Sequence, residues 1–337
     1  MKKASILILS IWALLFLSLL AFFDGLAVRQ EILLEEKIEG LTSLYQLAYS
    51  GTMLSIEYLS LEGWGKAEGL NSSWADSRGV FKDIKLGKGS FSLEYSYINN
   101  LGLKKEMRYG VVDEERKLNI NYAQRESLKR LLVNTAGISE DEALSIAGSI
   151  IDWRDPDDIL NGSKEKLSEK ISYLNSGYGY TPPNRPLKSL EELLLVKNMT
   201  KQVFVKIRDF ITVFSKGEVN INTVSYPVLE SLGFDTGLAD KIISFRCGPD
   251  LVEGTSDDRL FSSPADITKD LSLYFDLSKG ETAFLQKIIS SEIFSVCSEN
   301  FTSICRSRLD NSRLYGKIIC VFSRGGDVKY WGMGYSG

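Results

Sequence analysis

The first hydrophobic feature of the chain is an uninterrupted apolar run, residues 5–23, which contains no proline and follows Lys2 and Lys3. As a helix this run is about 28 Å long, close to the hydrocarbon thickness of a bilayer. A secretory signal has a shorter apolar core and then a small-residue cleavage site. The run therefore predicts a transmembrane helix, and the two lysines place the N-terminus in the cytoplasm and the bulk across the membrane.

Positions 24–60 continue with apolar residues at helical spacing, while charged residues occupy the other face. We expect one long helix whose apolar stripe contacts a partner helix and whose C-terminal half packs on its own domain. The residues assigned to this partner face are Leu26, Leu33, Ile38, Leu41, Tyr45 and Ala48.

Hydrophobic and polar residues alternate in two separate parts of the chain, with helical spacing between them from residue 113 to about residue 292. The alternating runs are 80–86, 90–98 and 105–112 in the first part, and 293–297, 303–309, 314–322 and 327–333 in the second. Strands on both sides of a helical block predict that the block is inserted into one antiparallel sheet. The expected fold is thus α+β, with the long N-terminal helix packed on a sheet formed by 61–112 and 293–337, and a large all-α domain, 113–292, inserted into that sheet.

The inserted segment contains an internal duplication. Both copies open with an aliphatic residue followed by Asn-Ile-Asn, continue as helix, Gly-containing turn and helix, and reach an arginine, Arg154 or Arg246. The repeat units are 113–215 and 216–292, and each is typical of a helix-hairpin-helix. Such hairpins can bind DNA phosphates through turn amides and nearby basic residues. Because both turns here are rich in carboxylates, a packing scaffold is favoured over nucleic-acid binding.

Two acidic loops follow the equivalent ends of the repeats, DWRDPDDILNG (152–162) and GPDLVEGTSDDR (248–259). Clustered carboxylates that repel one another, without His or Cys, suit a hard cation such as Ca²⁺. The second loop is the more favoured because its sequence returns the chain on itself, and a solvated turn is the alternative for both. The candidate ligands are Asp155, Asp157 and Asp158 in the first loop and Asp250, Glu253, Asp257 and Asp258 in the second.

The composition narrows the chemistry further. The chain has no histidine, which removes Ser-His-Asp and Cys-His catalysis, and it has no CxxC motif for a thiolate metal site. Across a bacterial inner membrane the four cysteines are disulfide candidates with three possible pairings, and free thiols are the alternative. They are Cys247, Cys297, Cys305 and Cys320. The formal net charge of −4 argues against a polyanion-binding surface over the whole chain.

In the order of its motifs the chain resembles the K class of minor pseudopilins of type II secretion (the GspK family). The resemblance covers nearly the whole length and rests on the apolar start and on five further stretches. These are DEERKLNIN (113–121), IIDWRDPDD (150–158), YTPPNRPLKSLEELLLVKNMT (180–200), ITVFSKGEVNINT (211–223) and YWGMGY (330–335).

The resemblance implies a pilin-like helix and sheet with an inserted α-domain that holds Ca²⁺. It also implies a leader, 1–4, which prepilin peptidase cleaves between Ala4 and Ser5, and a methylated new N-terminus. Most pilin-like subunits carry a glutamate five residues into the mature helix, where it neutralises a neighbour's amine, and this position is Leu9 here. A first subunit has no earlier neighbour, so an apolar residue suits it better than an unpaired carboxylate in the membrane.

The expected function is therefore a non-enzymatic tip subunit that initiates and caps the periplasmic pseudopilus during protein export. Its expected partners are the I and J minor pseudopilins, the major pseudopilin, the inner membrane and prepilin peptidase. The main alternative is a membrane-tethered helix-hairpin-helix DNA receptor of the competence type. A third possibility is a calcium-dependent hydrolase that depends on Asp257 or Asp258.

Overall fold

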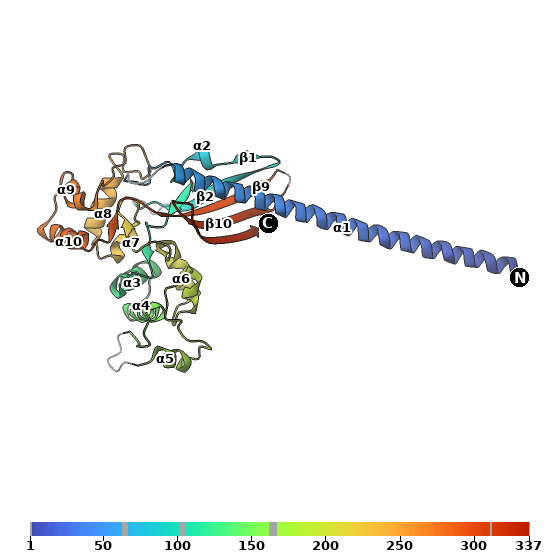
Figure 1. Ribbon diagram of the computed structural model, residues 1–337, viewed down its shortest axis with the longest axis horizontal. Coiled ribbons are helices and arrows are strands. Elements are labelled where there is room, and N and C mark those ends of the chain that lie inside the picture. Colours follow the sequence, from blue (N-terminus) through green and yellow to red (C-terminus); the bar gives the residue numbers. More distant parts are fainter. Residues whose placement is uncertain (1, 63–66, 101–104, 162–166, 311, 337) are drawn as a thin grey trace.

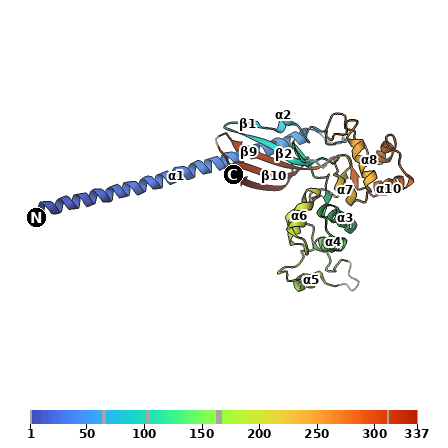
Figure 2. The same ribbon diagram turned by 180° about the vertical axis from the view of Figure 1, so that it is seen from behind.

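A single 60-residue helix, α1 (Lys2–Leu61), begins the protein and projects far beyond the rest of it. The computed structural model describes residues 2–62, 67–100, 105–161, 167–310 and 312–336, with side chains from residue 6 onward. Figures 1 and 2 show the first half of α1 as a free rod, with the N-terminus at its tip. We call the part of the protein from residue 40 onward the head.

The centre of the head is an antiparallel sheet in which strands from the two ends of the sequence meet. Its main order is β1-β2-β9-β10-β11, with β3 paired to β2 and β4 paired to β9. Phe91 of β2 lies opposite Ser307 of β9, so the early and late strands share one hydrogen-bonded ladder. The strands are β1 (Ile84–Leu86), β2 (Gly89–Ile98), β3 (Lys105–Tyr109), β4 (Val111–Asp113), β9 (Asn300–Leu309), β10 (Tyr315–Ser323) and β11 (Val328–Ser336).

The second half of α1 packs on one face of this sheet, over β2, β9 and β10. Successive strand residues point to opposite faces, so alternate apolar positions reach the helix. The core between them includes Leu47 and Ala48 of α1, Phe91 of β2, and Cys305 and Ile318 of β9 and β10. The helix lies very close to the sheet at Gly51, where an added Cβ would be 2.4 Å from the sulfur of Cys305.

Residues 114–299 lie between β4 and β9 and form a mainly helical inserted block. The first repeat contains α3 (Arg125–Leu131), the π-helical turn η1 (Leu132–Ala136), α4 (Glu140–Arg154), α5 (Glu169–Asn175), η2 (Leu190–Leu195), α6 (Lys201–Ile207) and η3 (Arg208–Phe210). The second contains α7 (Tyr226–Ser231), α8 (Thr236–Arg246), η4 (Pro264–Asp266), α9 (Ile267–Ser272) and α10 (Lys279–Ile289). One hydrophobic cluster runs through both repeats. Figure 1 shows the first repeat to one side of the sheet and the second at the end farthest from the N-terminus.

The two repeats make the same hydrogen bonds at equivalent positions. In each, the second asparagine of the Asn-Ile-Asn motif both donates to and accepts from one backbone residue, and the terminal arginine donates to two carbonyls beside the motif. The asparagine pairs are Asn121 with Leu187 and Asn222 with Phe261; the arginine pairs are Arg154 with Ile120 and Ala123, and Arg246 with Ile221 and Val224.

The strands differ from the sequence expectation in three places. Residues 78–81 form a short helix, α2 (Arg78–Phe81), so the first strand begins only at Ile84. The run 293–297 does not join the main sheet, because β8 (Phe294–Ser295) pairs in parallel with β7 (Val219–Asn220) and closes the second repeat. An equivalent pair, β5 (Leu118–Asn119) with β6 (Ile211–Thr212), closes the first, so the inserted block is not purely helical.

A buried polar joint connects the block to the sheet. Asp113 accepts hydrogen bonds from Thr223 and Ser298, and Glu115 accepts two from the backbone and side-chain amides of Asn300. Burial raises the pKa of both carboxyl groups. Because buried polar groups need partners, these bonds fix the start of the block against β9.

Candidate functional site

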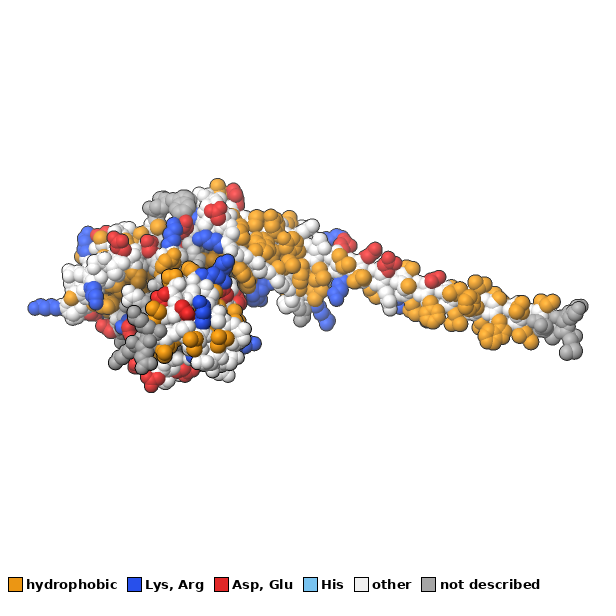
Figure 3. Space-filling model, turned by 60° about the horizontal axis from the view of Figure 1, so that its bottom comes forward, with side chains coloured by type: hydrophobic (Ala, Val, Ile, Leu, Met, Phe, Trp, Pro, Cys, Tyr) orange, Lys and Arg blue, Asp and Glu red, His pale blue; other side chains and the backbone are white. Residues whose placement is uncertain are grey.

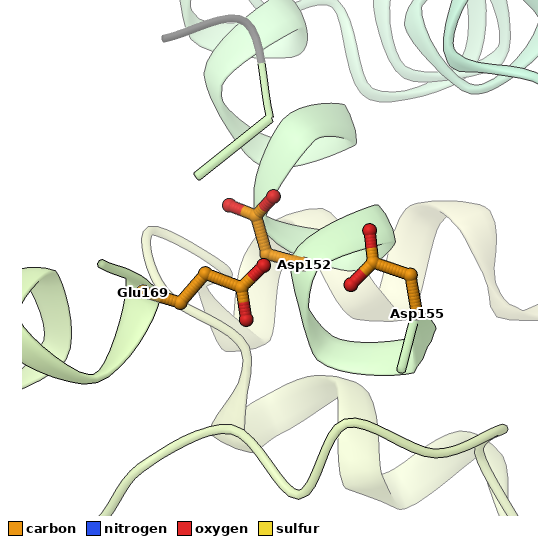
Figure 4. A group of neighbouring side chains, drawn as sticks. All are labelled: Asp152, Asp155 and Glu169. Carbon is orange, nitrogen blue, oxygen red and sulfur yellow. The ribbon is translucent and has the colours of Figure 1, made fainter. Parts of the chain in front are cut away.

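Three carboxyl groups meet at the end of α4 in the first repeat. Asp152 lies in the last turn of α4, Asp155 directly follows the helix, and Glu169 is the first residue of α5 after its N-cap, Ser168. One oxygen from each of the three lies within 4.8 Å of the others. Figure 4 shows the three side chains pointing toward one another. Among the described residues this is where His, Cys, Asp or Glu atoms gather closely enough to hold a metal ion.

The oxygens of this cluster are short of hydrogen-bond donors. Glu169 has no exposed surface, and its Oε1 has no partner among the described residues, nor has Oδ1 of Asp155. Asn184 donates to Oε2 of Glu169 at 3.2 Å, while its own buried Oδ1 has no partner in the part of the chain that the structure describes. Such buried oxygens are unfavourable unless something supplies positive charge or a donor.

The electrostatics of the cluster lead to the same conclusion. Burial, together with the charges of Asp152, Asp155, Asp157 and Asp158, raises the pKa of Glu169 to about 8. Burial and Asp155 raise the pKa of Asp152 to about 6, although the backbone N–H of Asn161 partly opposes this. A cation between the groups would remove the repulsion, and an all-oxygen ligand set is the type that Ca²⁺ prefers. The residues present therefore fit a calcium ion.

The other candidate ligands of the first loop have different roles. Asp158 accepts from the backbone N–H of Lys170 at 3.1 Å and from the hydroxyl of Ser168 at 3.0 Å, which ties the loop to the start of α5. Asp157 is exposed and accepts from the N–H of Ile159 at 2.8 Å. Of the three expected ligands only Asp155 lies in the described cluster. The cluster's other members are Asp152, which belongs to the same acidic loop, and Glu169, which lies outside both acidic loops.

Glu253 of the second loop is unsuitable as a metal ligand, which corrects the sequence expectation. Its carboxylate accepts from the Tyr97 hydroxyl, from both amides of Asn100 and from Arg246, at 2.7–3.1 Å. The Arg246 guanidinium is buried beside it, and the two form an ion pair at 2.9 Å. Since a carboxylate has about four acceptor sites, none is left for a cation. Glu253 instead anchors the second repeat to β2.

The three aspartates of the second loop hold the loop's own backbone. Asp250 accepts from the N–H of Val252 at 2.8 Å, Asp257 from the N–H of Asp250 at 3.2 Å, and Asp258 from the N–H of Gly254 at 2.7 Å. Their oxygens do not come together in a three-carboxylate group within the described part of the chain. The preference between the two loops is therefore the reverse of the expected one.

The expected partner face on α1 is only partly accessible. Leu26, Leu33 and Ile38 are 41–56% exposed, and Leu41 and Tyr45 are half-buried. Ala48 is fully buried against the sheet, because the head begins to cover α1 from Leu44 onward. The side chains of Ala4 and Ser5, the expected processing site, lie outside the described residues.

The free half of α1 has the properties of a membrane span. Its best 18-residue window has a mean hydropathy of 2.8, and none of that window is buried in the protein. Among the helices of the described residues, α1 is the one that is long and apolar enough to cross a membrane. Figure 3 shows hydrophobic side chains along this part of α1 and acidic ones closer to the head.

The expected disulfides are absent, since all four cysteines are free. Cys305 lies opposite Ile318 and Cys320 opposite Ser303, so these two residues are diagonal neighbours rather than a direct pair. Diagonal residues on adjacent strands lie about 7–8 Å apart, beyond the usual reach of a disulfide. Cys247 is buried in the inserted block, whereas Cys297 is exposed.

The turns of the two hairpins are acidic, as the sequence indicates. Ser139 caps α4, whose first turn contains Glu140, Asp141 and Glu142, and Asp235 caps α8. Lys129 near the first turn is already within 3.2 Å of Glu140. The turns therefore present carboxylates where a phosphate would have to bind.

A long apolar helix with a free first half, a sheet packed on its second half, and a helical block between two strands of that sheet together define a pilin-like subunit. Residues 98–216 match the family model described as type II secretion system (T2SS), protein K. This match supports the resemblance to the K class that the sequence motifs indicate.

One protein sequence and one solved structure are similar to this chain. The chain is 28% identical over 204 residues to type II secretion system protein K of Pseudomonas aeruginosa, a match that covers 58% of this chain and 56% of that protein. The chain thus matches just over half the length of this relative. It also resembles a chain in the crystal structure of the GspK-GspI-GspJ complex from the enterotoxigenic Escherichia coli type 2 secretion system. That likeness has a TM-score of 0.63 at 18% identity and covers 90% of this chain and 99% of the other, which shows the fold.

Proposed function

We propose that the protein is a minor pseudopilin of a type II secretion system that sits at the tip of the pseudopilus, which it initiates and caps during protein export. It acts as a structural subunit rather than an enzyme. A single pass of α1 anchors it in the inner membrane, with the N-terminus in the cytoplasm and the head in the periplasm. The observation that carries this proposal is the free apolar half of α1 in a chain whose residues 98–216 match protein K.

The position of the second repeat supports a place at the tip. It lies at the end of the head farthest from the N-terminus, so it stands above the sheet when α1 is anchored (Figure 2). A further subunit stacked in the same orientation would meet this repeat instead of the sheet. The partners are the I and J minor pseudopilins, as in the complex named for the structural relative, and the major pseudopilin below them.

The N-terminal sequence supports the same place. If prepilin peptidase cleaves after Ala4, position five of the mature chain is Leu9, and no carboxylate precedes Asp24. A buried, unpaired glutamate in the bilayer would cost several kcal/mol, and a first subunit has no earlier neighbour that would neutralise it. We expect Leu9→Glu to reduce pseudopilus assembly, and unchanged assembly would contradict this explanation of Leu9.

Calcium has a structural role in this proposal. Asp152, Asp155 and Glu169 hold the ion and so join the end of α4 to the start of α5. When bound, the ion supplies the positive charge that the buried oxygens lack.

The competence-type DNA receptor receives no support from the comparisons, and both hairpin turns carry acidic residues. DNA binding would show an affinity whose logarithm falls with the logarithm of the salt concentration.

The proposal is tested by co-purification. The full-length chain is expressed with the I and J pseudopilins of its own system and isolated from detergent-solubilised membranes, with and without EGTA. We expect both partners to co-purify, and Ile38→Glu to reduce their recovery about tenfold, while Leu273→Glu on the far side of the head does not. If neither partner co-purifies, with or without EGTA, the proposal is overturned.

A further inference from the structure

The last strand of the main sheet has a free edge. In the order β1-β2-β9-β10-β11, β11 lies at one end and pairs with β10. Among the described residues no other strand pairs with it, and residues 330–336 make no backbone hydrogen bond outside that ladder. In an antiparallel pair every second residue turns its N–H and C=O away from the partner strand. These groups of β11 therefore face outward at the margin of the sheet (Figure 1).

The two ends of the sheet differ in how they are protected. Edge strands in proteins are usually short, or carry a charge or a proline that prevents another strand from pairing with them. At the opposite end, β1 has three residues and contains Lys85. By contrast, β11 has nine residues, and its stretch YWGMGYS (330–336) contains neither a charge nor a proline. This contrast within one sheet indicates that β11 is left open for a partner strand.

The first repeat covers only the start of β11. The Phe214 ring lies 6.4 Å from the Tyr330 ring, and Nζ of Lys329 donates to the carbonyl of Phe214 at 3.3 Å. We call the remaining residues, 331–336, the open edge. Strands are commonly about five or six residues long, so the open edge has room for a complete added strand.

One face of the open edge is apolar. Trp331 lies opposite Cys320 and Met333 opposite Ile318, and both of these β10 residues belong to the core beneath α1. Because alternate residues share a face, Trp331, Met333 and Tyr335 are on the side of α1. Met333 is nevertheless 54% exposed and Tyr335 41% exposed. A strand added beside them would place alternate side chains next to these residues, so apolar residues fit there.

The other face of the open edge has an unpaired positive charge. Gly334 lies directly opposite Lys317 of β10, and an added Cβ at Gly334 would meet nothing within 4 Å, so the long stem of Lys317 has room across β11. Within the described chain Lys317 has no hydrogen-bond or ion-pair partner. Burial and the nearby Arg306 and Arg208 lower the pKa of Lys317, while Arg306 has its own acidic partner, Glu94, at 3.3 Å. A carboxylate is the group that this lysine lacks.

We propose that the open edge receives an extended segment of another protein as an added β-strand, with apolar side chains beside Met333 and Tyr335 and carboxylates beside Lys317. The outward N–H and C=O groups would supply main-chain hydrogen bonds, and the alternation of apolar and acidic residues would supply specificity. A second copy of β11 fits less well, because it offers no carboxylate and would bring two Lys317 side chains together.

The test uses the purified full-length chain in detergent micelles and a fluorescein-labelled octapeptide of alternating glutamate and valine. Two control peptides are an alternating lysine–valine octapeptide and a block peptide of four glutamates followed by four valines. Fluorescence anisotropy should show binding of the glutamate–valine peptide, and at least about tenfold weaker binding of both controls. Because only the purified chain is measured, the result does not depend on the proposed place in the pseudopilus.

Two pairs of variants test the residues that carry the proposal. Lys317→Gln should weaken binding of the glutamate–valine peptide about fivefold, whereas Lys279→Gln, an exposed lysine of the second repeat, should not. Gly334→Glu should weaken it by a similar factor, because the new carboxylate would pair with Lys317 and repel the peptide. Gly334→Ala, with open space around its Cβ, should leave it unchanged.

Hydrogen exchange of single amides decides whether the bound peptide is a strand. The peptide should slow exchange at every second residue of the open edge, since the amides between them already donate to β10. Absence of binding, equal binding of the block peptide, or binding without this alternate protection would overturn the proposal. An unchanged affinity of Lys317→Gln would overturn it as well, and so would concentration-dependent protection of β11 without peptide, which would identify a second copy as the occupant.

Discussion

Calcium binding at Asp152, Asp155 and Glu169 should release protons, and the number follows from the raised pKa values of Glu169 and Asp152. With a pKa of about 8, Glu169 holds about 0.9 of a proton at pH 7 in the metal-free protein, and Asp152, with a pKa of about 6, holds about 0.1. A bound ion requires both groups to be charged. Binding at pH 7 should therefore release about one proton per ion.

The same values give the pH dependence of affinity. Between pH 6 and pH 8 the number of protons displaced falls from about 1.5 to about 0.5, so affinity should rise about 100-fold over this range and level off above it. Without metal, the folded protein binds the Glu169 proton more tightly than the unfolded chain does. The contribution of this group to the stability of the metal-free protein should thus be complete below about pH 4.5, and be lost as the pH rises from 4.5 to 8.

Isothermal titration calorimetry of the chelator-treated full-length protein, in buffers with different ionisation enthalpies, measures the protons released. Glu169→Gln should weaken Ca²⁺ binding at least tenfold and abolish most of the proton release. Asp250→Asn in the second loop is the matched control and should leave both unchanged. The reasoning is refuted if affinity does not change between pH 6 and pH 8, or if Asp250→Asn weakens binding as much as Glu169→Gln.

Three further changes test the packing of the head. Gly51→Ala should lower the free energy of unfolding by about 1–3 kcal/mol, because its Cβ would lie 2.4 Å from the Cys305 sulfur, whereas Gly40→Ala, with open space around it, should be neutral or stabilising. Glu253→Gln should lower it by about 3 kcal/mol in chemical denaturation, since Arg246 would remain buried without its counter-charge. Native protein should react with maleimide at Cys297 alone, and unfolded protein at all four thiols, because burial shields the other three and raises the pKa of Cys247 and Cys320 to about 12.

These expectations can each be contradicted. Equal effects of Gly51→Ala and Gly40→Ala would mean that α1 does not lie close to the sheet. A loss below about 1 kcal/mol for Glu253→Gln would mean that the ion pair does not anchor the second repeat. Fewer than four reactive thiols after unfolding without reductant would reveal a disulfide, and the strand register places Cys305 and Cys320 too far apart for a direct bridge.

Much of the architecture could be predicted from local patterns. The uninterrupted apolar run predicts the free half of α1, and period-two alternation on both sides of a helical segment predicts a sheet interrupted by a block. The repeated Asn-Ile-Asn motif and terminal arginine predict two equivalent hairpins, in which Arg154 and Arg246 make equivalent bonds. Such patterns are informative because a helix or a strand places side chains on one face at a fixed spacing, so the order of apolar residues within a short segment indicates its secondary structure.

The candidate metal site was less predictable. Asp152 and Asp155 are three residues apart, so they can share one side of a helix end, and this spacing was a usable signal. Glu169 lies 14 residues beyond Asp155 at the start of another helix, and no local pattern connects it to them. The second loop is equally acidic, yet its oxygens are occupied by its own amides and by Tyr97, Asn100 and Arg246.

The apolar N-terminal helix, the sheet and the duplicated helical insertion could all be inferred from the sequence, because each follows from periodicity or a repeated motif within short segments. The three-dimensional arrangement was needed to show that Glu169 completes a carboxylate cluster, that Glu253 is an anchor, and that Ala48 is buried while Ile38 is exposed. These outcomes depend on which distant segments meet, and the burial and hydrogen bonds created there determine whether an acidic or apolar side chain is available to a ligand or a partner.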